Sequence, residues 1–515
     1  MTSTSKYSQQ DRLAGGLQGL LIGDAIGVPY EFKAPGDLPE RGLIDLQPPI
    51  GFARSHANIP PGTWSDDGAQ ALCLLESLLS RGTLDLEDFA GRLLAWFKEG
   101  HLAVGGHVFD IGIQTATALE QLDQGMPIDE AAPRGEFDNG NGALMRVLPL
   151  ALWHQGDETE LITLAGRQAL PTHGHPRSAV ACAMLCLWAR SELAGAADAW
   201  TEARKVLLKH GKAAGLPQEE VERVLDPGHA DRIQGSGYVV DTLWSARHAV
   251  EKAHDFEETV RTAIALGNDT DTTAAVAGGI AGIRYGLYGI PLRWRQGLRG
   301  KELFEPLQAR LIAHATGEQA GSSGAPRTSQ THPLQIGTLG LPSGGRIGIT
   351  FCPGKKQSFA MSGRWDRDLD RDLAAIKAWG ASHLVTLVTD EEMRELGVTA
   401  LAERAAAHGI TWYHAPILDG HIPGVVPEGA DPACWFEGVW PALSVQLQSA
   451  LAAGEGVVVH CKGGLGRAGT VATLLLAAQN PSLSAREAIA QVREARPDAV
   501  ETVVQEQYLL AMVDR

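Results

Sequence analysis

The sequence lacks the features of membrane-spanning proteins, of secreted proteins and of proteins that bind duplex nucleic acid. Its 44 lysines and arginines are outnumbered by 61 aspartates and glutamates, which gives a formal net charge of −17. No basic stripe is therefore available to displace counterions from duplex DNA or RNA. No uncharged apolar run is long enough for a membrane span, and the polar start MTSTSKYSQQDR has no apolar signal core. We expect a soluble cytoplasmic protein that binds neither duplex nucleic acid nor a membrane.

Cysteine is scarce, and the chain shows no internal repeat. The six cysteines are Cys73, Cys182, Cys186, Cys352, Cys434 and Cys461. Their spacing matches neither a zinc motif nor a disulfide framework, as is usual in a reducing compartment. Cys182 and Cys186 lie four residues apart in an apolar stretch, which favours a place in a helical core. A chemical role is therefore left open only for a cysteine with a special local setting.

The chain changes character once, and the change predicts its domains. Residues 316–345 lose hydrophobic periodicity and fill with Gly, Ser, Thr and Pro, as a flexible linker does. Long Ala/Leu-rich stretches at helical spacing precede this segment, and alternating strand-like and helical stretches such as HLVTLVT and GVVVH follow it. We predict a multidomain chain with an all-α domain over residues 1–315, a linker over 316–345 and an α/β domain over 346–515.

The segment HCKGGLGRAG, residues 460–469, follows a run of three valines. A strand that delivers Cys461 into a Gly-rich turn before a helix aims backbone N–H groups and a helix N-terminus at one point, where an anion binds. The same field favours the thiolate, which is the nucleophilic form, and Arg467 can grip two phosphoryl oxygens. The alternative is an ordinary turn beside a buried cysteine. The predicted phosphate cradle consists of Lys462, Gly463, Gly464, Leu465 and Gly466.

This loop resembles the signature loop of the protein-tyrosine and dual-specificity phosphatases. The segment from about residue 363 through HGITWYHAPILDG is similar to the cyclin-dependent-kinase-inhibitor-3-type (kinase-associated) phosphatases, which also carry Gly-Gly-Leu-Gly-Arg. The resemblance implies that Asp419, in PILDGHIPG, is the general acid for the leaving group. Two positions stand out. Ala468 replaces the usual Ser or Thr, which predicts slow hydrolysis of the phosphocysteine, and Lys462 resembles loops that act on unusually anionic substrates.

The larger domain carries a second set of chemical residues, at the starts of two small-residue helices. TWSDDGAQALCLLESLL and LGNDTDTTAAVAGGIAGIRYG place these residues in two clusters: Ser65, Asp66 and Asp67, and Asp269, Asp271 and Thr272. Helix capping is the alternative role for each cluster alone. If the two ends meet, four carboxylates and two hydroxyls converge, which is tolerable only around hard cations. Oxygen ligands indicate Mg2+, Mn2+ or Ca2+ rather than zinc. A pair of such ions can bind a ribose diol and polarise an anomeric bond.

The motifs GDAIGVPYE, WSDD, GHVFDIG, GNGALMR, HGHP and GNDTDTT occur in an order that resembles the ADP-ribosylglycohydrolase family. The resemblance implies an all-helical domain with a binuclear Mg2+ or Mn2+ centre that cuts ADP-ribose from an acceptor. Glu31 would gate or assist the site, and Asp110 would lie near the scissile bond. Gly68 replaces the usual Thr after the two aspartates. The implied metal ligands are Ser65, Asp66, Asp67, Asp269, Asp271 and Thr272, and the implied ADP-ribose cleft is lined by Asn141, Gly142, Met145, Arg146 and His173.

Together these patterns predict a bifunctional hydrolase. The first domain would remove ADP-ribose from a modified protein or small molecule with two Mg2+ or Mn2+ ions, and the second would dephosphorylate a phosphoprotein or phosphomonoester through Cys461. One alternative is the processing of a phosphorylated ADP-ribose-type small molecule or of an RNA end. Another is a module that binds ADP-ribose or phosphate without turnover. The residues indicate the chemistry more closely than the substrates.

Overall fold

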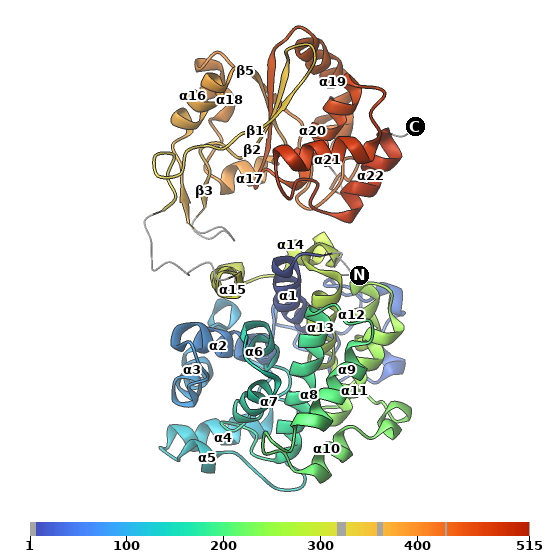
Figure 1. Cartoon of the computed structure of the whole chain (residues 1–515). Coiled ribbons are helices and arrows are strands. Elements are labelled where there is room, and N and C mark those ends of the chain that lie inside the picture. The colour runs from blue at the N-terminus through green and yellow to red at the C-terminus, as the bar shows by residue number, and fades with distance from the viewer. Residues whose placement is uncertain (1–6, 317–325, 358–363, 428–429, 514–515) are drawn as a thin grey trace. The chain divides into compact units, whose positions relative to one another are not determined.

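The computed structural model describes residues 7–316, 326–357, 364–427 and 430–513. The chain divides into two compact units, Met1–Gly321 and Ser322–Arg515 (Figure 1). Every regular element described in the first unit is a helix, whereas the second combines strands and helices. The predicted fold class, an all-α domain followed by an α/β domain, is confirmed.

The helical unit buries one continuous core of mainly Leu, Ile, Val, Ala and Trp side chains. Its helices are α1 (Gln9–Gly27), α2 (Asp66–Arg81), α3 (Leu86–Glu99), α4 (Ile113–Asp123), α5 (Ile128–Ala131), α6 (Leu148–Trp153), α7 (Glu158–Arg167), α8 (Pro176–Leu193), α9 (Ala199–His210), α10 (Gln218–Val224), α11 (Val239–Lys252), α12 (Phe256–Ile264), α13 (Thr270–Tyr285), α14 (Leu292–Gly297) and α15 (Lys301–Thr316).

Helices α1 and α13 lie side by side in this unit (Figure 1), closer than ordinary side chains permit. A Cβ atom on Gly15 would lie 2.2 Å from the carbonyl oxygen of Gly282, and one on Gly23 would lie 2.0 Å from that of Ala274. Such spacing requires glycine, because a methyl group would overlap the facing backbone. Residues four apart share one helix face. The face of α1 that meets α13 is formed by Gly15, Gly19, Gly23 and Gly27.

The two central helices run in opposite directions, so the end of α1 meets the start of α13. A Cβ atom on Gly27 would lie 2.3 Å from Cα of Asp271, and the hydroxyl of Thr270 donates a hydrogen bond to the carbonyl of Gly27 at 2.9 Å. The residues that follow α1 are therefore held against the residues that open α13. This junction positions the acidic residues of both segments.

The α/β unit is built on a five-stranded sheet with the order β1-β2-β7-β5-β6. Strand β1 is antiparallel to β2, and the other neighbours are parallel. The strands of this sheet are β1 (Gly337–Gly340), β2 (Arg346–Phe351), β5 (Ala381–Thr386), β6 (Thr411–His414) and β7 (Gly456–Cys461), and β3 (Lys356–Gln357) pairs with β4 (Trp365–Asp366) in a separate ribbon.

Helices cover both faces of this sheet, as parallel strands require (Figure 1). Alternate residues of β7 show the division: Val457 and Val459 join the core under α19 to α22, and Val458 joins the core under α16 and α18. The helices of this unit are α16 (Leu369–Trp379), α17 (Asp390–Glu395), α18 (Leu401–Ala407), α19 (Phe436–Ala452), α20 (Gly466–Gln479), α21 (Ala485–Ala495) and α22 (Val503–Val513).

The predicted phosphate loop lies where the order of the strands in the sheet reverses. Strand β7 follows β6 in the chain but pairs between β2 and β5. Ligands of open α/β sheets bind beyond the carboxyl ends of strands at such a point. Cys461 ends β7 there, opposite Phe351 at the end of β2.

Strand β1 lies inside the segment expected to be a linker, residues 316–345. Leu339 pairs with Ile347 of β2, and both side chains are buried in the same core. The strand is only four residues long and has glycine at both ends, so its sequence shows no alternation from which to predict it. The linker residues 317–325 lie outside the described residues.

Within the described part of the chain, no helix is both long enough and apolar enough to cross a bilayer. The longest helix, α1, has 19 residues and contains Asp11, Arg12 and Asp24.

The close contact of α1 and α13 makes a prediction about stability. Gly23→Ala should lower the free energy of unfolding of the helical unit by about 1–3 kcal/mol, because the added methyl overlaps the Ala274 carbonyl. Gly91→Ala, on the exposed face of α3 with open space around it, should instead be neutral or raise it by up to about 1 kcal/mol. Calorimetric unfolding of the full chain would measure both. Equal effects of the two substitutions would contradict the close packing.

Candidate functional sites

The acidic residues expected to bind metal come together at the junction of α1, α2 and α13. One carboxylate oxygen each from Asp24, Asp67 and Asp271 lies within 4.8 Å of the others, and the same holds for Glu31, Asp269 and Asp271. The two groups share Asp271. The structure therefore contains two neighbouring clusters of oxygen donors, an arrangement that suits two hard cations.

The other predicted ligands stand beside these carboxylates. The hydroxyl of Ser65 caps α2 by accepting from the backbone N–H of Asp67 at 3.3 Å. The hydroxyl of Thr272 donates to Asp67 Oδ1 at 3.2 Å and so connects α13 to α2. The amide of Gln70 donates to Asp66 Oδ2 at 3.1 Å. All six predicted ligands thus lie at one junction, and the capping role expected as an alternative is also present at Ser65.

These carboxylates are buried with little compensation. Burial, followed by repulsion from neighbouring carboxylates, holds the pKa of Asp66, Asp67 and Asp271 well above the usual range. Within the described residues, Oδ2 of Asp67 and Oδ2 of Asp271 have no hydrogen-bond partner although both are buried. Unpaired buried acceptors of this kind are costly in a finished site. Their positions and chemistry fit a hard divalent cation.

Asp24, which we did not predict as a site residue, connects α1 to the start of α2. Its side chain is fully buried and accepts hydrogen bonds from the backbone N–H of Ser65 at 2.8 Å and from that of Gly68 at 2.8 Å. Burial raises the pKa of Asp24 to about 7. The only sequence signal was its place in GDAIG, since a single acid within an apolar helix does not show which backbone groups it will meet.

Part of the expected ADP-ribose cleft forms beside Asp269. Asn141 donates to Asp269 Oδ2 at 2.8 Å, and a Cβ atom on Gly142 would lie 2.8 Å from the His173 ring. Burial, with the Arg146 charge, lowers the pKa of His173 to about 3, so its imidazole is neutral at pH 7.

Arg146 and Met145, also expected along the cleft, are buried at 0% and 3% exposure. The guanidinium of Arg146 donates to Gln70 Oε1 at 2.8 Å and to Gln168 Oε1 at 3.2 Å. Because Gln70 in turn donates to Asp66, Arg146 supports the acidic cluster from behind and does not line an open surface. The GNGALMR motif alone does not show whether Arg146 lines the cleft or lies behind the acidic cluster.

Glu31 and Asp110 meet directly at the mouth of the same site, and a histidine that we did not predict contacts both. His56 Nε2 lies 2.7 Å from Glu31 Oε2 and 3.7 Å from Asp110 Oδ1. The backbone of Phe32, His56 and Asp110 is in the left-handed region, with φ of 59°, 49° and 59°. Such strained residues gather at functional sites. The centre of the His56 ring also lies 5.7 Å from that of Phe32 and 5.2 Å from that of Phe109.

In the α/β unit, the loop after β7 has the geometry of an anion cradle. Cys461 is 4% exposed at the end of β7, and the backbone N–H of Gly464 donates to its sulfur at 3.2 Å. Gly464 has φ of 74°, and a Cβ atom there would lie 2.4 Å from the Thr350 backbone. The loop can therefore turn only with glycine at this position. Helix α20 begins at Gly466, so its N-terminus faces the same point.

Arg467 is held in the cradle by groups from two segments. Its guanidinium makes a two-pronged ion pair with Glu392, at 2.7 Å and 2.8 Å, and donates to the Ile417 carbonyl at 2.9 Å. The Asp419 carboxylate lies 2.9 Å from Arg467 Nη2, which brings the predicted general acid to the cradle. Glu392 was not predicted, because its segment, TDEEMREL, has three adjacent acids and no motif.

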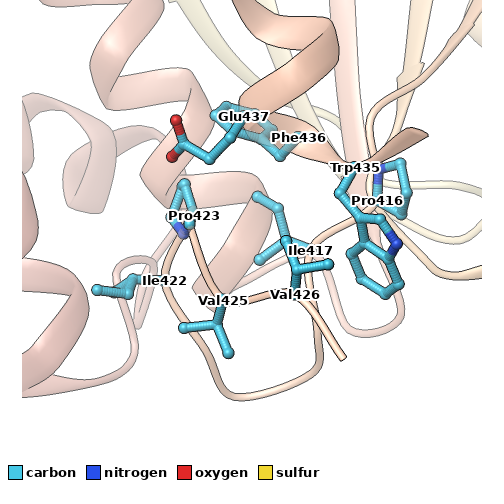
Figure 2. Close-up of a pocket in the computed structure, with 10 residues that line it drawn as sticks. Pro416, Ile417, Ile422, Pro423, Val425, Val426, Trp435, Phe436 and Glu437 are labelled. Atoms are coloured by element: carbon cyan, nitrogen blue, oxygen red, sulfur yellow. The ribbon is translucent and has the colours of Figure 1, made fainter. Parts of the chain in front are cut away.

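A shallow apolar hollow lies beside the Asp419 loop, and Figure 2 shows the side chains that line it. The segment that follows Asp419 forms one wall through Ile422, Pro423 and Val425, and Trp435 forms another. Neither Cys461 nor Arg467 lines it, but it adjoins the phosphate site through Ile417, whose carbonyl accepts from Arg467.

Comparison with known proteins matches the helical unit. The profile of the family described as ADP-ribosylglycohydrolase matches residues 5–321. The chain belongs to the ADP-ribosylglycohydrolase family. The ADP-ribosylarginine hydrolase Tri1 of Serratia proteamaculans (strain 568) is 32% identical over 315 residues, which cover 60% of this chain and 81% of that protein. The ADP-ribosylhydrolase ARH3 of Danio rerio is 28% identical over 345 residues, with 58% and 90% covered.

The α/β unit matches a second family of enzymes. The profile described as Swiss Army Knife protein, DSP-PTPase phosphatase domain, matches residues 441–509. Cyclin-dependent kinase inhibitor 3 of Rattus norvegicus is 27% identical over 208 residues, which cover 40% of this chain and 90% of that protein. Both predicted resemblances are thus confirmed, and both domains come from enzyme families.

The structure bears on both departures from the family patterns, Gly68 and Ala468. At Gly68 of the ADP-ribosylglycohydrolase domain, a Cβ atom would lie 2.8 Å from both Leu21 and Trp64, whose side chains occupy that space. In the phosphatase domain the hydroxyl of Thr470 donates to the Gly466 carbonyl at 2.9 Å. Thr470 is therefore engaged within α20, and it does not supply the hydroxyl that is lacking at Ala468.

The contacts of Asp24 predict a role in positioning the acidic cluster. Asp24→Asn replaces one acceptor oxygen with an amide that would face a backbone N–H, and should destabilise the ADP-ribosylglycohydrolase domain by about 1–3 kcal/mol. Affinity for Mn2+ or Mg2+ should fall with it. Thermal unfolding and isothermal titration with each ion measure the two effects. Asp37→Asn, on the surface, is the matched control, and an Asp24 variant indistinguishable from it would refute the role.

Proposed function

We propose that the chain is a bifunctional hydrolase that releases ADP-ribose at a centre of two Mg2+ or Mn2+ ions and phosphate at Cys461. The observation that carries the first activity is the pair of carboxylate clusters sharing Asp271, with buried acceptor oxygens unpaired. When bound, the ions would hold the ribose diol and polarise the anomeric carbon and a water molecule. The family membership supports this chemistry for the helical unit.

The protein's own residues then have distinct tasks in ADP-ribose release. The residues that would hold the ions are Ser65, Asp66, Asp67, Asp269, Asp271 and Thr272. Asn141 lies beside Asp269, and Asn141 and His173 would orient the ADP-ribose, with the neutral imidazole able to accept or donate one hydrogen bond. Asp110 would take the proton of the attacking water at the mouth of the site, and Glu31 would hold Asp110 in place through His56.

We propose arginine as the acceptor from which ADP-ribose is removed. The mouth of the site combines the carboxylates of Glu31 and Asp110 with the ring of Phe32, which is 70% exposed. Carboxylates and aromatic faces are the groups that bind a planar guanidinium. The similarity to ADP-ribosylarginine hydrolase Tri1 supports the same choice. Serine acceptors, a phosphorylated ADP-ribose-type small molecule and an RNA end are the alternatives.

The phosphatase domain would act on a phosphomonoester, on protein or on a small molecule. The Cys461 thiolate would attack phosphorus while Arg467, held by Glu392, stabilises the equatorial oxygens. Asp419 lies at the same guanidinium and would protonate the leaving oxygen, then accept the proton of the water that cleaves the phosphocysteine. The six cysteines are all free thiols, which fits the predicted cytoplasmic location.

The metal proposal predicts a sharp separation between the two activities. Removal of divalent ions, or Asp66→Asn with Asp67→Asn, should slow ADP-ribose release by at least about a thousandfold, because several kcal/mol of charge stabilisation are lost. Phosphate release from the same sample should not change. Mass spectrometry with ADP-ribosylated arginine, serine and RNA-end substrates measures the first activity. Ion binding without release from any substrate would favour a binding module, and release without ions would overturn the ligand assignment.

Ala468 predicts a slow second half-reaction in the phosphatase domain. The wild-type chain should release the alcohol in a burst and accumulate phosphocysteine at Cys461. Ala468→Ser should speed turnover about tenfold or more, since a hydrogen bond to the departing thiolate is worth about 1.5–3 kcal/mol. Rapid-quench kinetics with p-nitrophenyl phosphate would show the burst, and Cys461→Ser is the inactive control. A wild-type reaction without a burst would contradict this account of Ala468.

A further inference from the structure

Lys355 is a buried lysine beside the phosphate loop that neither family motif includes. It follows β2 in the segment CPGKK and is 4% exposed. Its ammonium donates to the carbonyl of Lys462, the residue next to Cys461, at 3.4 Å. The turn that carries Lys355 is fixed by Asp372 of α16, which accepts from the backbone N–H of Gly354 at 2.9 Å. Lys355 is thus held against the loop from the neighbouring strand.

The charge of Lys355 has aromatic neighbours and, in the part of the chain that the structure describes, no counter-ion. Its ammonium lies 5.0 Å from the centre of the Phe351 ring and 4.4 Å from that of Trp365. The nearby Arg367, against the same rings, has a two-pronged ion pair with Asp372 at 2.7 Å and 2.8 Å. Among the described residues, no carboxylate lies within 4 Å of the Lys355 ammonium. An unpaired buried cation is costly unless an anion joins it.

The anions available to Lys355 are those of the phosphate loop. Burial lowers the pKa of Lys355 to about 8; the thiols of Cys352 and Cys461 oppose this effect, and Arg367 and Lys462 add to it. The ammonium is therefore present at pH 7 and is lost in the mildly alkaline range. At neutral pH it adds a positive charge behind the loop, where a bound phosphoryl group would carry negative charge.

We propose that Lys355 is a positioning residue of the phosphatase site, which binds the Lys462 carbonyl and uses its charge to stabilise the Cys461 thiolate. The proposal rests on the cysteine-dependent phosphatase function proposed above. The carbonyl contact would fix the Lys462 peptide beside the Gly464 amide that donates to the Cys461 sulfur, and the buried, aromatic-lined setting would strengthen the effect of the charge. Lys355 itself does not touch the reacting atoms.

The test is the pH profile of Cys461 alkylation by iodoacetamide, which reports the thiolate without requiring turnover. Peptide mass spectrometry would follow Cys461 from pH 5 to 9, with the exposed Cys434 as an internal reference. In Lys355→Met the half-maximal pH should rise by about one unit or more, as expected when a neighbouring opposite charge is lost. Lys356→Met, which changes an exposed lysine next in sequence, should reproduce the wild-type profile.

A second variant separates the charge from the hydrogen bond. Lys355→Gln keeps a donor for the Lys462 carbonyl without the charge, so its profile should shift like that of Lys355→Met. An unshifted profile in a folded Lys355→Met or Lys355→Gln variant, judged by matching thermal unfolding, would overturn the proposal. The phosphatase function fails separately, if wild-type protein with a normal alkylation profile releases no phosphate from p-nitrophenyl phosphate.

Discussion

The close contact of α1 and α13 is the constraint on which the ADP-ribosylglycohydrolase domain depends. Glycines on both helices bring the backbones so near that the end of α1 lies against the start of α13. That contact sets Asp24 and Glu31 of one segment beside Asp269 and Asp271 of the other. The contact between the two helices is stabilised by backbone packing and burial. Part of this stabilisation is offset by repulsion between the carboxylates that the contact brings together.

The two sites leave opposite charges uncompensated. In the helical unit, buried carboxylate oxygens of Asp67 and Asp271 have no partner among the described residues, and a divalent cation would complete them. In the α/β unit, Lys355 is a buried cation with no carboxylate beside it among the described residues, and the neighbouring loop is the one proposed to bind phosphate. In each case the protein buries charge of one sign, and a ligand of the opposite charge would lower the cost of that burial. This complementarity connects the packing of each domain with the chemistry proposed for it.

Sequence patterns predicted the parts of the sites that depend on local spacing. The spacing of Cys461, Arg467 and the glycines between them predicted a phosphate-binding loop. The paired aspartates at two helix starts predicted a metal site. The supporting residues were missed. Each of them contacts a group that is distant in sequence, and the residues around it do not indicate which group that is. These residues are Asp24, His56, Glu392 and Lys355. Strand β1 was missed for a related reason, since its pairing with β2 defines it more than its four residues do.

The sequence by itself therefore determined the two fold classes and the family resemblances, and it indicated a chemistry for each site, because hydrophobic periodicity and short motifs are local properties. Only the tertiary structure decided which groups share a cluster and which stand behind it. Arg146 shows the difference: it lies in a cleft motif, yet it is fully buried and supports Asp66 through Gln70. Burial and the long-range contacts that set charge and hydrogen bonding arise only when distant segments pack together.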